Sequence, residues 1–430
     1  MIFSGIAFIA GAQANSQYSP YSLYGIGDLS TPGTAYNRTM AGVGIANRNN
    51  RFINITNPAA VTARDSLAFM ADFSLYGNNV FFRQGENKSI NNVFNINDCV
   101  MSFPIWKSSA MMVGIMPYSG TGFGYAFDYQ DKDIIGQTGN VSYAASGTGA
   151  IYQVFAAAGV TLWKKLSLGA QCNYYFGNLS KKYYGIFSNS AYKGFQNGNE
   201  LKLNGVSGKF GLQYEQTLGA KSTVGIGATY SMNTKMKGYI EDYSYSDASS
   251  VTDTLYHKTD TLDRSGKIRF GSEIGVGICY KYEDKWMIEF DYTRSDWRNS
   301  GFDNTPGFMG NARASSTSSV FSSSVAQSFR LGFEITPNRN DIRYYMKKVT
   351  YRGGAYYKDE YYMVDGKKIS AMGLTFGATF PVFRWYNGIS VGIDLGQRGT
   401  TDSNLIRERY VNLSIGFNIF DIWFRKPQYD

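Results

Sequence analysis

The sequence is poor in the residues that carry most enzyme and metal chemistry. Its 430 residues contain one histidine, three cysteines and nine prolines. The lone His257 lies in a polar segment, so neither a histidine-based catalytic triad nor an imidazole metal site is indicated. Cys99, Cys172 and Cys279 are far apart and show no CxxC spacing, which argues against a metal knuckle and an obvious disulfide framework. We therefore predict a protein that is not an enzyme and holds no cofactor and no metal.

Long hydrophobic runs are also missing. Beyond the first residues, no stretch offers about twenty consecutive apolar residues, so no transmembrane helix is expected. Residues 1–16 combine apolar residues with small ones at Ala12 and Ala14, and we interpret them as a signal peptide, although the usual basic start is absent. A buried first strand is the alternative. The formal charge of +9 is spread along the chain rather than gathered on one face, which argues against nucleic acid and fits contact with anionic lipid headgroups.

What the chain has in abundance is alternation. From 411 to 419 every second residue is apolar and the residues between are small or polar, in the order Val411, Asn412, Leu413, Ser414, Ile415, Gly416, Phe417, Asn418 and Ile419. Successive side chains of a strand lie on opposite faces, so one face is apolar. A soluble β-sandwich alternates too. The length, the small and polar second face and an aromatic content of 16% favour a transmembrane antiparallel β-barrel, which is all-β.

About fourteen such strands are predicted between residues 67 and 420. Long connections at 118–150, 178–207, 233–267 and 295–327 alternate with short turns. Outer-membrane barrels keep their short turns in the periplasm and their long loops outside the cell. We therefore predict the outer membrane of a Gram-negative bacterium, with both termini and the tail 421–430 in the periplasm. The long loops are expected to be exposed and mobile, and Thr336–Lys348 is the one short-turn position with a longer link.

The segment at 17–66 shows little alternation and precedes the predicted barrel. It holds an Ala-Gly-rich stretch around Gly42 and Gly44, followed about a dozen residues later by Asn57, Pro58 and Ala59. This order, ahead of about fourteen strands, resembles the FadL-type long-chain fatty acid transporter family, of which the chain looks like a divergent branch. The resemblance implies that these five residues belong to a hatch inside the lumen. An ordinary lead-in to the first strand is the alternative.

The same resemblance implies an inward kink in the third strand, through which hydrophobic substrate leaves sideways. Here that strand runs into Pro117, Ser119, Gly120 and Gly122, residues that break or bend strand pairing. The strand could equally end in its loop at this point. Aromatic residues that follow would line a ligand access route, namely Phe123, Tyr125 and Phe127.

Charged residues are also predicted on the lumen side of the strands. Glu289, Asp291, Arg330 and Glu334 are expected to face inward and to pair with opposite charges there. The resemblance implies passive uptake of hydrophobic small molecules such as fatty acids, with outer-membrane lipid as a further partner. The alternative is a non-transporting accessory or scaffold barrel of a secretion or barrel-assembly machine, which would bind other outer-membrane or periplasmic proteins. An apolar lumen would favour uptake, whereas Gly, Ser and paired charges would favour a plugged scaffold.

Overall fold

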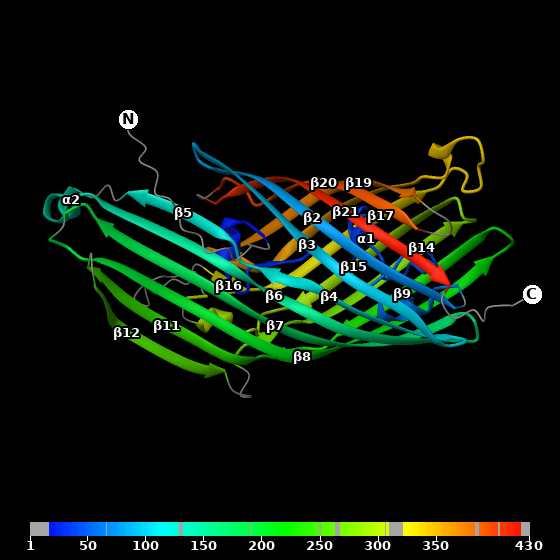
Figure 1. The fold of residues 1–430 in the computed structure, drawn as a ribbon, viewed down its shortest axis with the longest axis horizontal. Helices are drawn as coiled ribbons and strands as arrows, with labels where there is room; N and C mark the ends of the chain where they lie inside the picture. The colour runs from blue at the N-terminus through cyan, green and yellow to red at the C-terminus, as the bar shows by residue number, and fades with distance from the viewer. Residues whose placement is uncertain are drawn as a thin grey trace, which may run out of the picture.

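The computed structural model describes residues 17–65, 67–128, 132–189, 191–248, 251–262, 267–305, 307–308, 321–382, 387–402 and 405–422 (Figure 1). The expected signal peptide at 1–16 and most of the expected tail at 421–430 lie outside these residues. The last strand continues to Ile422, so it runs past the expected barrel end at residue 420.

A closed antiparallel barrel of 14 strands makes up most of the described chain. Each barrel strand pairs with the next, and the last pairs with the first to close the ring. In chain order the barrel strands are β2 (Ala68–Gln84), β3 (Asn87–Trp106), β4 (Ser109–Gly120), β6 (Val141–Leu162), β7 (Leu166–Phe187), β8 (Gly194–Leu218), β9 (Ser222–Ser231), β14 (Ser272–Tyr282), β15 (Trp286–Asp296), β17 (Val325–Ile335), β18 (Thr350–Val364), β19 (Lys367–Pro381), β20 (Gly388–Arg398) and β21 (Arg407–Ile422). The predicted barrel and its strand number are confirmed.

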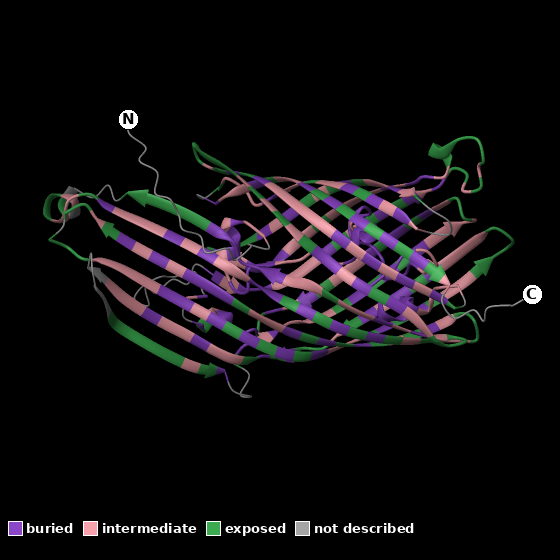
Figure 2. Ribbon diagram, in the orientation of Figure 1, coloured by how far each residue is buried: buried purple, intermediate pink, exposed green. Residues whose placement is uncertain are grey.

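The two faces of the wall differ as the alternation predicts. On β14, Ile274, Val276 and Ile278 are exposed on the outside, whereas Cys279 on the other face is buried. Figure 2 shows the same banding of buried and exposed residues along the other barrel strands. No described helix is both long and apolar enough to cross a bilayer. In a membrane-spanning barrel, an apolar outward face of this kind is the one that contacts lipid.

Residues 17–65, which we call the luminal segment, lie inside the barrel. The segment contains η1 (Pro20–Leu23), β1 (Asp28–Leu29), α1 (Ala35–Arg38) and η2 (Pro58–Thr62). Most of its residues from Ser19 to Val61 are buried although they form almost no sheet of their own. Their hydrogen bonds therefore go largely to the wall, as the next subsection describes.

One end of the barrel, which we call the long-loop end, carries more regular structure than expected. Strands β7 and β8 extend through most of 178–207. The segment 233–267 contains a hairpin of β11 (Lys237–Ala248) and β12 (Val251–Leu262), and β11 pairs antiparallel with the long-loop half of β8. The expectation of loops at these two places is wrong. Their Tyr-, Ser- and Asn-rich composition resembles a loop, but main-chain pairing to a neighbouring strand does not require apolar residues. Smaller elements at this end are β5 (Phe123–Asp128), α2 (Lys132–Thr138), β10 (Thr234–Lys235), β13 (Arg269–Phe270), η3 (Phe302–Asn304) and β16 (Phe321–Ser323).

The opposite end, the short-turn end, has tight connections. Trp163 and Glu283 adopt positive φ angles of 48° and 49°, which close the turns after β6 and β14. Trp163 is 81% exposed and Trp286 is half-buried, whereas Trp385 lies outside the described residues. The link between β17 and β18 is longer and contains η4 (Tyr345–Lys347).

Candidate functional site: a filled barrel lumen

The predicted hatch residues Asn57, Pro58 and Ala59 start the short helix η2 against the wall. The Asn57 side chain accepts a hydrogen bond from the Ala59 N–H at 3.0 Å and donates to the Ile45 and Leu212 carbonyls at 2.7 and 3.2 Å. Asparagine is favoured at this capping position, and proline at the next because its φ is already helical. One amide side chain thus joins two parts of the luminal segment to strand β8.

Glycines on the inner face of the wall make room for this turn. A Cβ on Gly211 would overlap Asn57 Oδ1 and come within 2.8 Å of Pro58 Cδ. A Cβ on Gly169 would overlap the Pro58 main chain. A strand glycine often marks close approach of another backbone. The small second face predicted from the sequence therefore accommodates the luminal segment.

The other two predicted hatch residues lie in a turn that faces β15. Gly42 has a φ of +80°, in the left-handed region that favours glycine. The N–H groups of Gly44 and Ile45 donate to Asp291 Oδ2 at 2.8 and 3.0 Å. Those of Ala46 and Asn47 both donate to Glu289 Oε1 at 2.9 Å. Two buried carboxylates of the wall therefore hold four consecutive main-chain amides.

The predicted lumen charges face inward. Glu334 has the expected type of partner, an opposite charge, whereas Glu289 and Asp291 bind the luminal segment. Asp291 is opposite Arg330 in the β15–β17 register, yet its carboxylate accepts hydrogen bonds from the luminal segment. Glu334 pairs with Arg352 at 2.8 Å. The Arg352 guanidinium also lies over the Tyr36 and Phe52 rings, 4.4 and 4.6 Å from their centroids. Sequence reasoning missed Arg352, because its partners are distant in the chain and nothing local marks it.

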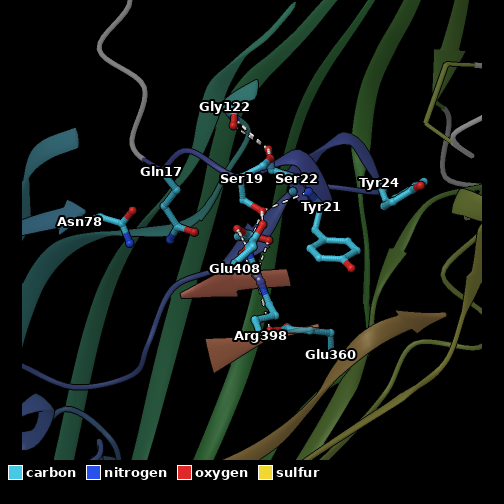
Figure 3. A network of polar contacts seen from close by, with 12 residues as sticks. Gln17, Ser19, Tyr21, Ser22, Tyr24, Asn78, Gly122, Glu360, Arg398 and Glu408 are labelled. Atoms are coloured by element: carbon cyan, nitrogen blue, oxygen red, sulfur yellow. Dashed lines mark hydrogen bonds and ion pairs between the residues drawn. The ribbon is translucent and has the colours of Figure 1, made fainter. Parts of the chain in front are cut away.

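A second buried charge network fixes the first part of the luminal segment (Figure 3). Arg398 on β20 donates to both oxygens of Asp28 at 2.8 Å and to Glu408 Oε2 at 2.7 Å. Ser19 also bonds to Arg398 and Glu408. All four side chains are buried. Paired buried charges need such complete coordination, and none of these four residues was singled out in the sequence.

The strand pairing of the wall changes beside Pro117, Ser119, Gly120 and Gly122, the residues of the predicted kink. Pairing of β3 with β4 begins at Cys99–Ile115, so in the described chain residues 87–98 of β3 pair only with β2. The β4 register shifts between Pro117 and Ser119. Ser119 and Gly120 then pair with β1 of the luminal segment, and the Ser19 N–H donates to the Gly122 carbonyl at 2.7 Å. We call the boundary between β3 at 87–98 and β5, across which the described strands form no ladder, the wall seam. The luminal segment contacts the β5 side of this seam.

The three predicted access residues do not form one surface of uniform exposure. Phe123 is buried against Ala145 and Tyr183, whereas Tyr125 and Phe127 are exposed. The Phe127 ring packs on Tyr143 with 5.2 Å between centroids. Further inside, a core of aromatic and aliphatic side chains fills the long-loop end, including Trp297, Phe302, Phe321, Tyr361 and Tyr362.

A cavity of about 330 Å³ remains between the luminal segment and the wall. Its lining includes Arg38, Lys209, Glu273, Arg330 and Asp394, together with apolar residues. In the part of the chain that the structure describes, no group of three or more His, Cys, Asp or Glu side chains is arranged to hold a metal ion. An apolar ligand in this cavity would desolvate charged side chains, which is costly.

Comparison with solved structures confirms the resemblance in fold. TbuX, a toluene transporter of Ralstonia pickettii, is 16% identical with a TM-score of 0.59, over 90% of this chain and 98% of that chain. TodX, a toluene transporter of Pseudomonas putida, is 13% identical with a TM-score of 0.59, over 93% and 100%. A FadL homologue of Pseudomonas aeruginosa is 10% identical with a TM-score of 0.54, over 91% and 98%.

Two sequence comparisons were informative. No curated protein matches the chain. The family model described as BamG matches residues 1–430, and the chain therefore belongs to the BamG family.

Proposed function

We propose that this protein is a plugged accessory barrel of an outer-membrane assembly or secretion machine, which binds other proteins and does not pass substrate through its lumen. The proposal rests mainly on one observation. Glu289 and Asp291 accept hydrogen bonds from four consecutive main-chain amides of the luminal segment. A hatch that opens must release these bonds. A fixed plug keeps them.

The energetic cost of opening supports a plug. A hydrogen bond contributes about 0.5–1.5 kcal/mol between neutral groups and about 1.5–3 kcal/mol to a charged one, so four such bonds together oppose release by several kcal/mol. Opening would also leave two carboxylates in the lumen without these donors. Unless new partners replaced them, the open state would be a minor one at equilibrium.

Passive uptake of hydrophobic small molecules is the second candidate. The wall seam beside Gly122 favours it, because an interrupted wall is where an apolar compound could leave toward lipid. The fold is also shared with proteins described as toluene transporters. Under this function Tyr125 and Phe127 would meet the ligand first, and Gly42, Gly44, Asn57, Pro58 and Ala59 would belong to a movable hatch. The charged cavity lining and the filled long-loop end weigh against it.

Either function places the barrel in the outer membrane, with lipid around its exposed apolar face. We further propose that residues 1–16 direct export and that the short-turn end, where β21 ends at Ile422, faces the periplasm. Short turns on that side and long connections outside are the usual arrangement of such barrels. The first described residues lie elsewhere, because Tyr18 and Ser19 bond to Gly124 and Gly122 beside β5 at the long-loop end.

Depletion of the protein in its native bacterium separates the two functions. We expect the amounts of other folded outer-membrane barrels to fall several-fold, measured by proteomics and heat-modifiable gel migration, while uptake of radiolabelled fatty acid and toluene stays unchanged. A specific loss of uptake with normal barrel levels would contradict the accessory function and support transport. Complementation with the wild-type chain controls for effects on neighbouring genes.

A further inference from the structure

The link between β17 and β18, residues 336–349, is the one extended connection among the described turns at the short-turn end. We call it the rim loop. It projects from the barrel rim at the upper right of Figure 1. Joining two adjacent antiparallel strands takes as few as two residues. Most of the rim loop is therefore not needed to close the barrel.

The rim loop is held in one shape by its own hydrogen bonds. Asp341 Oδ1 accepts from the N–H groups of Tyr344 and Arg343 at 2.7 and 2.9 Å. These backbone donors lower the pKa of the Asp341 carboxyl below its ordinary value, and the Tyr344 N–H has the larger effect. The Asn338 N–H donates to the Lys347 carbonyl at 2.9 Å, and the Tyr345 hydroxyl donates to the Pro381 carbonyl at 2.8 Å. A preformed loop loses little conformational entropy on binding.

Its outer surface is apolar and basic. Ile342 is 94% exposed, and Tyr344, Tyr345 and Met346 are each about half exposed or more. The basic residues of the loop outnumber its single acidic residue, Asp341; they are Arg339, Arg343, Lys347 and Lys348. Tyrosine, methionine and arginine are enriched at protein–protein interfaces, and exposed isoleucine on a rigid loop suits insertion into a pocket.

The start of the rim loop is held to the short-turn end of the barrel by ion pairs. Arg339 contacts Asp284 at 3.2 Å, and Arg51 of the luminal segment contacts the same carboxylate oxygen at 2.8 Å. The row of outward apolar residues on β17 ends at Ile335, which pairs with Trp286. The loop thus starts beyond the apolar surface of the wall and is anchored toward the lumen side. This position favours a protein partner over lipid.

We propose that the rim loop is a docking element that inserts Ile342 into an apolar pocket with an acidic rim on a partner protein at the short-turn end. The inference rests on the proposed accessory function and deepens it by naming the contacting surface. Charge complementarity defines the partner. Arg343 lies beside the inserted side chain, and the loop keeps a net positive charge although Lys347 pairs with Asp341 at 3.4 Å, so acidic groups are expected opposite it.

Photo-crosslinking in the native bacterium tests the proposal. The photoreactive residue benzoylphenylalanine is placed at position 342, and the matched control carries it at Leu255, a 65% exposed residue on the hairpin at the opposite end. We expect one discrete protein adduct from position 342, mapped by mass spectrometry to an acidic surface of the partner. The adduct should fall at least tenfold when Arg343→Glu and Lys347→Glu are introduced together. The purified partner domain should bind Ile342→Asp at least tenfold more weakly than wild type.

Three outcomes would overturn the docking element. These are lipid adducts only, no adduct, or a protein adduct that the charge reversal leaves unchanged. Unaltered heat-modifiable migration of each variant shows that its barrel has folded. If depletion impairs barrel assembly but Ile342→Asp restores it fully, the docking element is wrong and the accessory function stands. If depletion leaves assembly intact while the charge-sensitive adduct persists, the accessory function fails and the docking surface stands.

Discussion

The luminal segment has two parts, which contact regions of the barrel wall that differ in strand pairing. Residues 31–64 lie against the paired part of the wall, including β2, β3 and β4, where wall glycines and the carboxylates of Glu289 and Asp291 contact the main chain. Residues 17–29 lie beside the wall seam. There the contacts are the Arg398 network and an aromatic core.

The difference shows where movement would begin. Main-chain hydrogen bonds against a closed wall are many and mutually supporting, so the later part moves only as a unit. The earlier part depends strongly on one guanidinium, because Asp28, Ser19 and Glu408 all bond to Arg398. If any part of the lumen opens, the wall seam should open first.

Replacing Arg398 should have the largest effect. Arg398→Gln leaves buried carboxylates without their cation, and removal of one partner from a buried ion pair typically costs about 3–5 kcal/mol. We expect a lower thermal unfolding midpoint and protease cleavage within 17–29 before the barrel unfolds. Arg298→Gln, which removes an exposed partner of Asp296, is the control and should leave the midpoint unchanged. An equal fall in the unfolding midpoint of both variants would show that the Arg398 network contributes no more to stability than an exposed ion pair.

A smaller effect on stability is expected from replacing a wall glycine that contacts the later part of the luminal segment. Gly211→Ala places a Cβ against Asn57 and Pro58, and overpacking of this kind costs about 1–3 kcal/mol. The measurement is the free energy of unfolding of the barrel in denaturant. At Gly77 the nearest atom to an added Cβ is 3.6 Å away, so Gly77→Ala should be close to neutral. A neutral Gly211→Ala would mean that the luminal segment does not rest there.

Removing the Asn57 side chain should cost less. Loss of a helix N-cap costs about 0.5–2 kcal/mol, and Asn57→Ala also removes one of the two donors to the Ile45 carbonyl, leaving Gln213. The barrel should keep its heat-modifiable migration and should not become leaky to antibiotics. Asn189→Ala removes the same type of side-chain bond, to Ala191, in an exposed turn and is the control. Leakage without loss of stability would instead support a movable hatch.

The smallest effect concerns the rim loop and pH. Because the folded pKa of Asp341 is depressed, its bonds stabilise the loop fully above the ordinary aspartate pKa of about 4 and lose that contribution only as pH falls through the lower folded value. Limited proteolysis at 336–349 should therefore be equally slow at pH 7 and pH 5 and faster near pH 3. Asp341→Asn should be cleaved faster than wild type at pH 7 and should show a weaker pH response.

Period-two alternation predicted the barrel, because pairing and lipid contact act along every strand and leave a local signature. It also placed Glu289 and Asp291 on the lumen face. Their partners could not be read, because the amides of 44–47 are about two hundred and forty residues away in the chain. The same holds for Arg398 and Asp28, separated by 370 positions. The hairpin of β11 and β12 was missed because it has few buried apolar residues, such as Ile240 and Leu262, and no regular alternation to recognise.

Hydrogen exchange at residues 44–47 tests the fixed plug most directly. In folded protein in detergent, a fixed plug predicts that the amides of Gly44, Ile45, Ala46 and Asn47 exchange within about tenfold of the paired amides of β15, as a shared opening event requires. Exchange of these four amides as fast as in the exposed rim loop, with β15 still protected, would contradict the account and make the luminal segment a moving hatch.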